Sequence, residues 1–112
     1  MAGKFVMAKT KNGYLVVNLK AGNGEVILTS ELYAAKASAQ NGIAAIRQNA
    51  QDDAQFERRS SKADEPYFVL KAANGEALGR SEMYSSAAAM ENGIASVKKN
   101  APDAAFADDT GY

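Results

Sequence analysis

The chain has 112 residues, 46% of them hydrophobic, and its 13 lysines and arginines balance its 13 aspartates and glutamates. This length and composition are ordinary for one folded domain, and the zero net charge gives no reason to expect a nucleic acid or an anionic membrane as partner. Cysteine and histidine are both absent from the sequence. Their absence excludes disulfides, thiolate nucleophiles and metal sites built on these two residues, and we expect no cofactor.

The N-terminal segment does not resemble a targeting sequence. Lys4 and Lys9 interrupt the apolar core that a signal peptide requires. No run in the chain approaches the roughly 20 apolar residues of a membrane-spanning helix. The sequence therefore predicts a protein of the cytoplasm with no membrane partner.

The chain is one unit written twice, with a spacing of 51 residues. Between positions 19–52 and 70–103, 17 of 34 aligned residues are identical and no gap is needed. Three motifs recur: Asn23-Gly24-Glu25 as Asn74-Gly75-Glu76, Ser30-Glu31-Leu32-Tyr33 as Ser81-Glu82-Met83-Tyr84, and Asn41-Gly42-Ile43-Ala44 as Asn92-Gly93-Ile94-Ala95. We infer two tandem repeats, at about 4–55 and 56–106, in a single pseudo-symmetric domain of residues 1–112. The polar residues 107–112 are expected to form a frayed tail.

In repeat one, the pattern predicts three strands and a helix. Apolar residues favour a strand over 5–10, an Asn-Gly hairpin turn follows, and residues 14–19 alternate with the period of two that is typical of a strand. The Asn23-Gly24 turn leads to a short strand over 26–28. A helix over 35–50 presents an apolar stripe, because its hydrophobic residues recur every three or four positions.

Repeat two follows the same order. A strand around Phe56 closes repeat one and opens repeat two, a turn occupies residues 62–65, and the next strand contains residues 67–70. A third strand over 77–79 precedes a helix that Pro102 ends. Ser85 stands where a helix N-cap belongs, whereas its counterpart is Ala34, so we expect helix one to begin less firmly.

These elements predict an α+β fold, in which two β-β-β-α-β repeats share one antiparallel sheet with both helices on one face. The Leu-Lys-Ala-x-Asn-Gly-Glu segments, the Ser-Glu-x-Tyr segments and the Asn-Gly-Ile helices together resemble the YegP-like family, also called DUF1508 or UPF0339. The resemblance covers residues 4 to 106. It implies that the closing strands are exchanged between the repeats, and that the chain is a monomer equivalent to a fused dimer. It implies no reaction, cofactor or catalytic residue.

The two Ser-Glu-x-Tyr segments combine a hydroxyl, a carboxylate and a phenol ahead of a helix, which could bind a ligand or move a proton. Without histidine or cysteine, nothing in the sequence activates the serine. The preferred explanation is structural: serine and glutamate satisfy the helix start, and tyrosine buries its ring. The candidate residues are Ser30, Glu31, Tyr33, Ser81, Glu82 and Tyr84.

Asn41 and Asn92 are the best candidates for a binding site. Each lies on the side of its helix away from the apolar stripe and precedes a glycine, and neither residue type favours a helix interior. Retention of both in both repeats indicates either close approach of a neighbouring segment, which is the simpler explanation, or a bound partner.

The sheet face opposite the helices is predicted to display Tyr14, Val16, Tyr67 and Val69, near Lys20 and Lys71 and near Arg58 or Arg59. Aromatic rings among cations are typical of surfaces that stack single-stranded nucleic acid. Sheet faces also favour aromatic and β-branched residues for packing alone. Nucleic acid is therefore possible but not favoured. The sequence predicts a non-enzymatic binding or structural module for a protein or small ligand, with weak single-stranded nucleic-acid binding as the alternative. It does not identify the partner.

Overall fold

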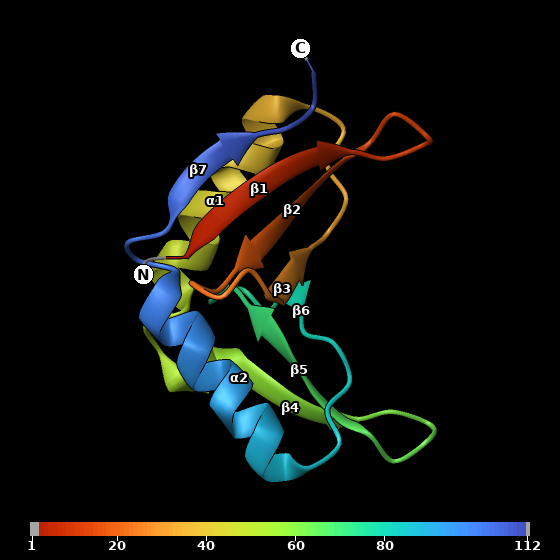
Figure 1. Cartoon of the computed structure of the whole chain (residues 1–112), viewed down its shortest axis with the longest axis vertical. Helices are drawn as coiled ribbons and strands as arrows, with labels where there is room; N and C mark the ends of the chain where they lie inside the picture. Colours follow the sequence, from red (N-terminus) through yellow and green to blue (C-terminus); the bar gives the residue numbers. More distant parts are fainter. Residues whose placement is uncertain (1–2, 112) are drawn as a thin grey trace.

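A computed structural model describes residues 3–111 as seven strands, two α-helices and a short 3-10 helix (Figure 1). Repeat one contains β1 (Lys4–Lys9), β2 (Leu15–Lys20), β3 (Val26–Ser30) and α1 (Lys36–Asn49). The 3-10 helix η1 (Asp53–Gln55) leads into repeat two, which contains β4 (Phe56–Ser60), β5 (Pro66–Lys71), β6 (Ala77–Arg80), α2 (Ala87–Asn100) and β7 (Ala105–Asp108). The predicted elements all form, with bounds shifted by one or two residues.

The strands form one sheet in the order β4-β5-β6-β3-β2-β1-β7. The closing strands are exchanged, as expected: β4 follows α1 but pairs with β5, and β7 follows α2 but pairs with β1. One pair departs from the predicted antiparallel sheet, because β7 runs parallel to β1. In repeat one, β1 already occupies the antiparallel place beside β2 that β4 takes beside β5. The closing strand β7, which runs in the same direction as β1, therefore lies outside β1 and parallel to it.

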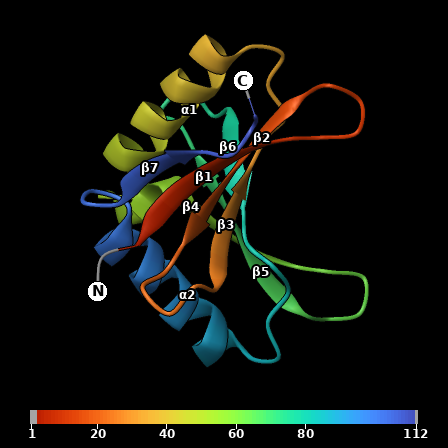
Figure 2. The same ribbon diagram turned by 45° about the horizontal axis from the view of Figure 1, so that its top comes forward.

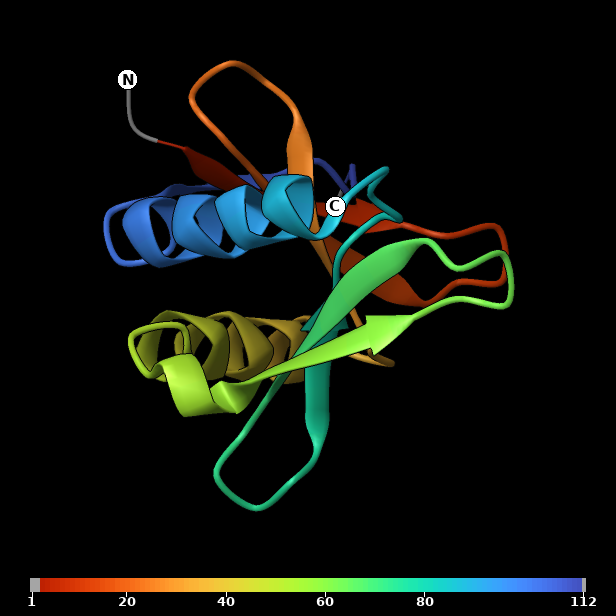
Figure 3. The ribbon, with the colours of Figure 1, turned by 90° about the horizontal axis from the view of Figure 1, so that it is seen from below.

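Both helices cover one face of the sheet, while the β1–β2 and β4–β5 hairpins project on the other side (Figures 2 and 3). The alternating strand residues and the helix stripes meet in a single core whose largest fully buried side chains include Phe5, Met7, Phe68, Leu70 and Ile94. Each helix contacts strands of both repeats: α1 packs on β2, β5 and β6, and α2 packs on β3 and β5. The core therefore belongs to the two repeats jointly.

The C-terminal ends of the two helices converge at the left of Figure 1, where their partial negative charges approach one another. The Arg47 guanidinium on α1 donates to the Ala101 carbonyl at 3.0 Å and to the Pro102 carbonyl at 3.2 Å. It also lies 4.8 Å from the centre of the Phe5 ring. The repeat equivalent, Lys98, lies 5.8 Å from the Phe56 ring. A cation thus stabilises the helix ends in each half.

Two predictions are wrong in detail: the residue that caps α2 and the residue at which the C-terminal tail begins. The N-cap of α2 is Ser86, whose Oγ accepts from the Ala89 amide at 3.1 Å, and not Ser85. Its counterpart at α1 is Ala35, which offers no side-chain bond. The tail does not fray from residue 107, because Ala107 and Asp108 belong to β7 and the Asp108 carboxylate pairs with Lys36 at 2.9 Å. Tyr112 lies outside the described residues. Within residues 3–111, no helix has the length and apolar character needed to cross a membrane.

Candidate functional site

The two serines of the Ser-Glu-x-Tyr segments are buried, and each hydroxyl accepts one hydrogen bond from the backbone and donates one to it. Ser30 Oγ accepts from the Val17 amide at 2.8 Å and donates to the Glu31 carbonyl at 2.8 Å. Ser81 Oγ accepts from the Phe68 amide at 3.0 Å and donates in the same way to Glu82. Ser30 ends β3 and Ser81 directly follows β6. Each hydroxyl thus joins the end of one strand to the neighbouring strand of the same repeat, where it stabilises the sheet.

The tyrosines of these segments explain the glycines inside the helices. A Cβ atom at Gly42 would overlap the Tyr33 hydroxyl and come within 2.5 Å of its Cζ atom. At Gly93 a Cβ atom would overlap the Tyr84 hydroxyl and lie 2.7 Å from its Cζ atom. The glycines are therefore retained because a phenol lies against each helix. The sequence indicated close approach of a neighbour, but the pairing of the two motifs was not predicted.

Burial raises the pKa of the Tyr33 phenol above its ordinary value of 10.0, and the Glu31 carboxylate adds to the shift. Burial likewise raises the pKa of Tyr84, with contributions from Glu82 and Glu25. Both phenols remain protonated at neutral pH, so neither is available to remove a proton. Glu31 and Glu82 are exposed. Serine, carboxylate and phenol in each segment thus have separate environments.

Asn92 lines a pocket of about 470 Å³ between α2 and the turn that joins β2 to β3. Both Asn41 and Asn92 are exposed, and among residues 3–111 neither side chain has a hydrogen-bond partner. The pocket brings the Asn-Gly turn of repeat one against the Asn-Gly-Ile helix of repeat two. Its lining residues are Ala21, Gly22, Asn23, Asn92, Ala95, Ser96, Lys99 and Asn100.

Within this pocket, polar groups are held in place by the helix. The Asn100 amide donates to the Ser96 carbonyl at 2.8 Å and to the Ser96 hydroxyl at 3.2 Å. Asn23 Oδ1 accepts from the Glu25 amide at 3.0 Å, which fixes the turn. Five lining residues are identical at the equivalent positions of the other half: Ala72, Asn74, Asn41, Ala44 and Asn49 stand for Ala21, Asn23, Asn92, Ala95 and Asn100.

The sheet face opposite the helices carries part of the predicted aromatic and basic set. Tyr14 is 45% exposed but lies in the β1–β2 turn, beyond the strands. Tyr67 is half-buried and stands opposite Arg59 across the β4–β5 pair. Val69, predicted to be displayed, is only 5% exposed because Glu57 and Arg80 flank it on the neighbouring strands.

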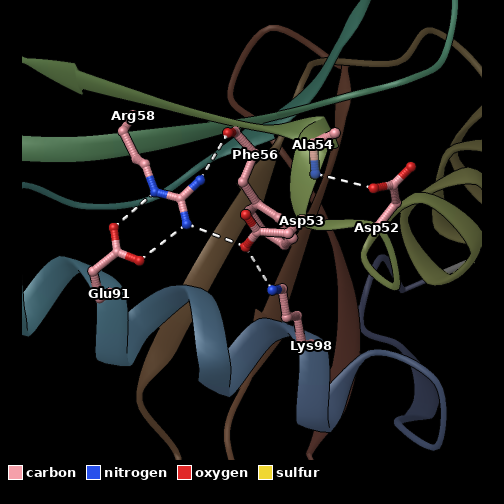
Figure 4. A network of polar contacts seen from close by, with 7 residues as sticks. All are labelled: Asp52, Asp53, Ala54, Phe56, Arg58, Glu91 and Lys98. Atoms are coloured by element: carbon pink, nitrogen blue, oxygen red, sulfur yellow. Dashed lines mark hydrogen bonds and ion pairs between the residues drawn. The ribbon is translucent and has the colours of Figure 1, made fainter.

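The basic residues of this face are partly neutralised. Lys71 and Arg59 both pair with the Glu57 carboxylate, at 2.5 Å and 3.0 Å, and together they lower the pKa of Glu57 to about 2. Lys20 is half-buried and lies opposite Lys4 on β1. Arg58 is not on this face. It lies on the helix side, where Glu91 and Asp53 bind it (Figure 4).

Sequence reasoning missed Arg80, which lies where the two repeats meet on the same face. Its cross-strand partner is Thr29, the repeat-equivalent residue. Arg80 and Glu31 border two adjoining hollows, of about 570 Å³ and 190 Å³, and the larger one also contacts Leu32, which is 59% exposed. Because repeat one carries threonine at this place, agreement between the repeats gave no signal for Arg80.

Comparison with known proteins agrees with the tandem organisation. The sequence profile of the "Domain of unknown function (DUF1508)" matches twice, over residues 10–57 and 61–108. The UPF0339 protein of Bordetella pertussis is 54% identical over 110 residues, covering 98% of both chains. The UPF0339 protein of Acinetobacter baylyi is 51% identical over 111 residues, covering 99% of this chain and all of that one.

Two solved structures share the fold over nearly the whole chain. The solution structure of the protein of unknown function yegP from E. coli has a TM-score of 0.94 at 46% identity, covering 100% of this chain and 97% of that one. A UPF0339 protein of Shewanella oneidensis has a TM-score of 0.92 at 47% identity, covering 98% and 93%. From the paired profile matches and the full-length similarity, the chain belongs to the UPF0339 (DUF1508) family, whose function is unknown.

Proposed function

We propose that the protein is a non-enzymatic binding module and that the Asn92 pocket receives a small polar ligand. The observation that carries the proposal is the Asn92 amide, which has no hydrogen-bond partner in the described part of the chain and borders a pocket of about 470 Å³ that both repeats form. Small-molecule sites typically occupy about 300–1,000 Å³ and contain a few convergent polar groups. This pocket has amides, a hydroxyl and an ammonium group.

The chemistry of the lining favours a compact, hydroxyl- or amide-bearing molecule with a negative charge. Asn23, Asn92 and Asn100 are side-chain amides, which offer donors and acceptors but do not titrate. The Lys99 ammonium is the charged group of the lining, so it favours a carboxylate or phosphate on the ligand. No residue of this lining is a general base or an activated nucleophile, which supports binding without reaction.

An amide chemical-shift titration of the labelled protein tests this proposal. Pools of sugars, amino acids, nucleosides and small organic acids are added to the wild type, to Asn92→Ala and to Gln40→Ala. Gln40 is an exposed amide on α1 outside the lining, so it serves as the matched control. We expect shifts at residues 21–23 and 92–100 that Asn92→Ala removes and Gln40→Ala preserves. Shifts elsewhere, or none with any pool, would reject the pocket.

Binding of single-stranded nucleic acid to the sheet face is a second candidate, favoured by one observation. Arg80 lies on this face near Tyr67 and Arg59, and among residues 3–111 its guanidinium has no ion-pair partner. Base stacking on tyrosine beside arginine is a recognised mode of binding. In the same titration, oligothymidylate or oligouridylate would shift residues 14–18 and 67–71, and added salt would weaken the effect.

A further inference from the structure

The two edges of the sheet are not equivalent, although the repeats are. At one edge β1 has β7 beside it, in a parallel register that pairs Phe5 with Phe106 and Met7 with Asp108. At the other edge stands β4, the repeat equivalent of β1, which ends the strand order. The arrangement of repeat one therefore defines a strand position beside β4 that no strand of residues 3–111 occupies.

The backbone groups at that edge are partly covered by side chains and by the preceding turn. The Gly3 carbonyl accepts from the Ala105 amide and the Met7 carbonyl from the Asp109 amide. The equivalent carbonyls, those of Ala54 and Arg58, and the backbone groups of Phe56 between them therefore face the open edge. The Arg58 guanidinium donates to the Phe56 carbonyl at 3.3 Å, and the Phe56 amide donates to the Asp53 carbonyl. Each of these bonds uses a group that an added strand would need.

Arg58 is held in this position by two carboxylates (Figure 4). Glu91 on α2 accepts from Arg58 Nε at 2.7 Å and from a terminal nitrogen at 3.0 Å, while Asp53 accepts at 3.1 Å. Lys98 joins the same Asp53 oxygen at 2.6 Å. Bidentate arginine–carboxylate pairs fix the guanidinium plane, so this network keeps Arg58 across the edge.

The network exists only where the edge strand is missing. The residues equivalent to Arg58 and Glu91 in repeat one are Met7 and Gln40, which cannot form an ion pair. Proteins commonly protect exposed sheet edges with charged side chains, because unpaired edges accept strands from other chains. The ion pair is thus present in the repeat whose edge strand is uncovered, and it is absent from the repeat whose edge strand is covered by β7.

We propose that the β4 edge is a strand-addition site for the Ala105–Asp108 segment of a second copy, and that the Arg58–Glu91–Asp53 network keeps it closed. Applied to β4, the register of β7 on β1 places Phe106 beside Phe56 and Asp108 beside Arg58. When the β4 edge opens, the Arg58 guanidinium gives up its ion pair with Glu91 and pairs with the Asp108 carboxylate of the incoming segment. The segment therefore complements the edge in both apolar surface and charge.

A peptide titration tests the proposal on the full chain. The probe is a synthetic peptide with the sequence of residues 103–111, added to labelled wild type, Glu91→Gln and Glu57→Gln. Glutamine is what repeat one carries at the position of Glu91, so the variant is expected to fold, and a circular dichroism spectrum checks this. Glu57→Gln removes a carboxylate from the same strand but from the opposite face of the sheet, so it is the matched control.

We expect the peptide to shift the amides of residues 56–60 in Glu91→Gln, with an affinity several-fold above that of the wild type and of Glu57→Gln. A peptide with asparagine in place of Asp108 should bind more weakly. Equal affinity for Glu91→Gln and wild type would overturn the proposal, as would shifts confined to residues 4–9, where the peptide replaces the chain's own β7. Sedimentation gives the second readout: Glu91→Gln should self-associate as concentration rises, and Asp108→Asn in the same chain should reverse this.

Discussion

At the scale of single residues, the repeated motifs are two halves of one contact. The phenol of each Ser-Glu-x-Tyr segment lies against the glycine of the following Asn-Gly-Ile helix, as in Tyr84 with Gly93. The serine of the same segment bonds backbone groups on either side, which fixes where the tyrosine can lie. The serine, tyrosine and glycine are identical in the two repeats because the position of each side chain depends on the others.

Substitution of Gly93 by alanine tests that contact. Alanine favours a helix over glycine by about 1 kcal/mol, whereas overpacking costs about 1–3 kcal/mol. The added Cβ would meet Tyr84 and come within 3.3 Å of the Phe68 ring, so overpacking should win. We expect a net loss of up to about 2 kcal/mol in the free energy of unfolding, measured with urea. Tyr84→Phe in the same chain should recover part of it, and equal losses with and without the hydroxyl would contradict the contact.

The buried phenols also predict a dependence of stability on pH. Because the folded-state pKa values of Tyr33 and Tyr84 are raised above 10.0, their contribution is fully present below the unfolded pKa. It is lost as pH rises through the folded values. Unfolding by urea should therefore become easier above about pH 10, and Tyr33→Phe/Tyr84→Phe should flatten this decline. Ultraviolet titration should show both phenols ionising above the ordinary tyrosine pKa of about 10; ionisation at that pKa or below it would be inconsistent with burial.

At the scale of elements, the two helices differ chiefly at their first residues. Ser86 bonds the Ala89 amide and caps α2, whereas Ala35 leaves the equivalent groups of α1 without a side-chain acceptor. At their other ends the helices are alike, because Arg47 and Lys98 each provide a cation over a core aromatic ring. The asymmetry between the helices thus lies at their starts.

Exchanging the caps tests this assignment. Ser86→Ala should lower the free energy of unfolding by about 0.5–2 kcal/mol, and Ala35→Ser should raise it by a similar order. Ser85→Ala is the matched control, because Ser85 is exposed and lies one residue before the cap. Thermal unfolding followed by circular dichroism measures all three. A larger loss for Ser85→Ala than for Ser86→Ala would show that the cap is misplaced.

The sequence predicted most elements because their signals are local. The Asn-Gly turns contain glycines at φ of +83° and +88°, in the left-handed region that favours glycine, and the strand period of two matches the buried faces. The cap was misplaced by one residue because Ser85 and Ser86 are chemically identical. Parallel pairing of β7 was missed because it depends on which strand already occupies the neighbouring place, and no local pattern records that.

The candidate site was less predictable. Asn92 was identified because it is out of place on a helix surface, but the pocket depends on the turn at Asn23, which is sixty-nine positions away in the sequence. Val69 was expected on the surface because alternation gives its direction, yet flanking side chains bury it. The period of a strand determines the face to which a side chain points, whereas the exposure of that side chain depends on the side chains of the neighbouring strands.

At the scale of the whole molecule, the exchange of closing strands makes each repeat depend on the other. Strand β4 completes the sheet of the repeat that follows it, β7 returns to β1, and both helices pack on strands from both halves. Neither half has a separate core. We therefore expect the two repeats to unfold together, as one cooperative unit.

Native-state amide hydrogen exchange of the full chain, followed by NMR, tests this interdependence most directly. The amides to compare are those of β2 and β5, the equivalent strands of the two repeats. If the repeats depend on each other, the slowest amides in both strands should exchange with the same free energy, equal to that of global unfolding, and with the same response to added denaturant. Distinct free energies, with one strand opening while the other stays protected, would show instead that the repeats fold independently.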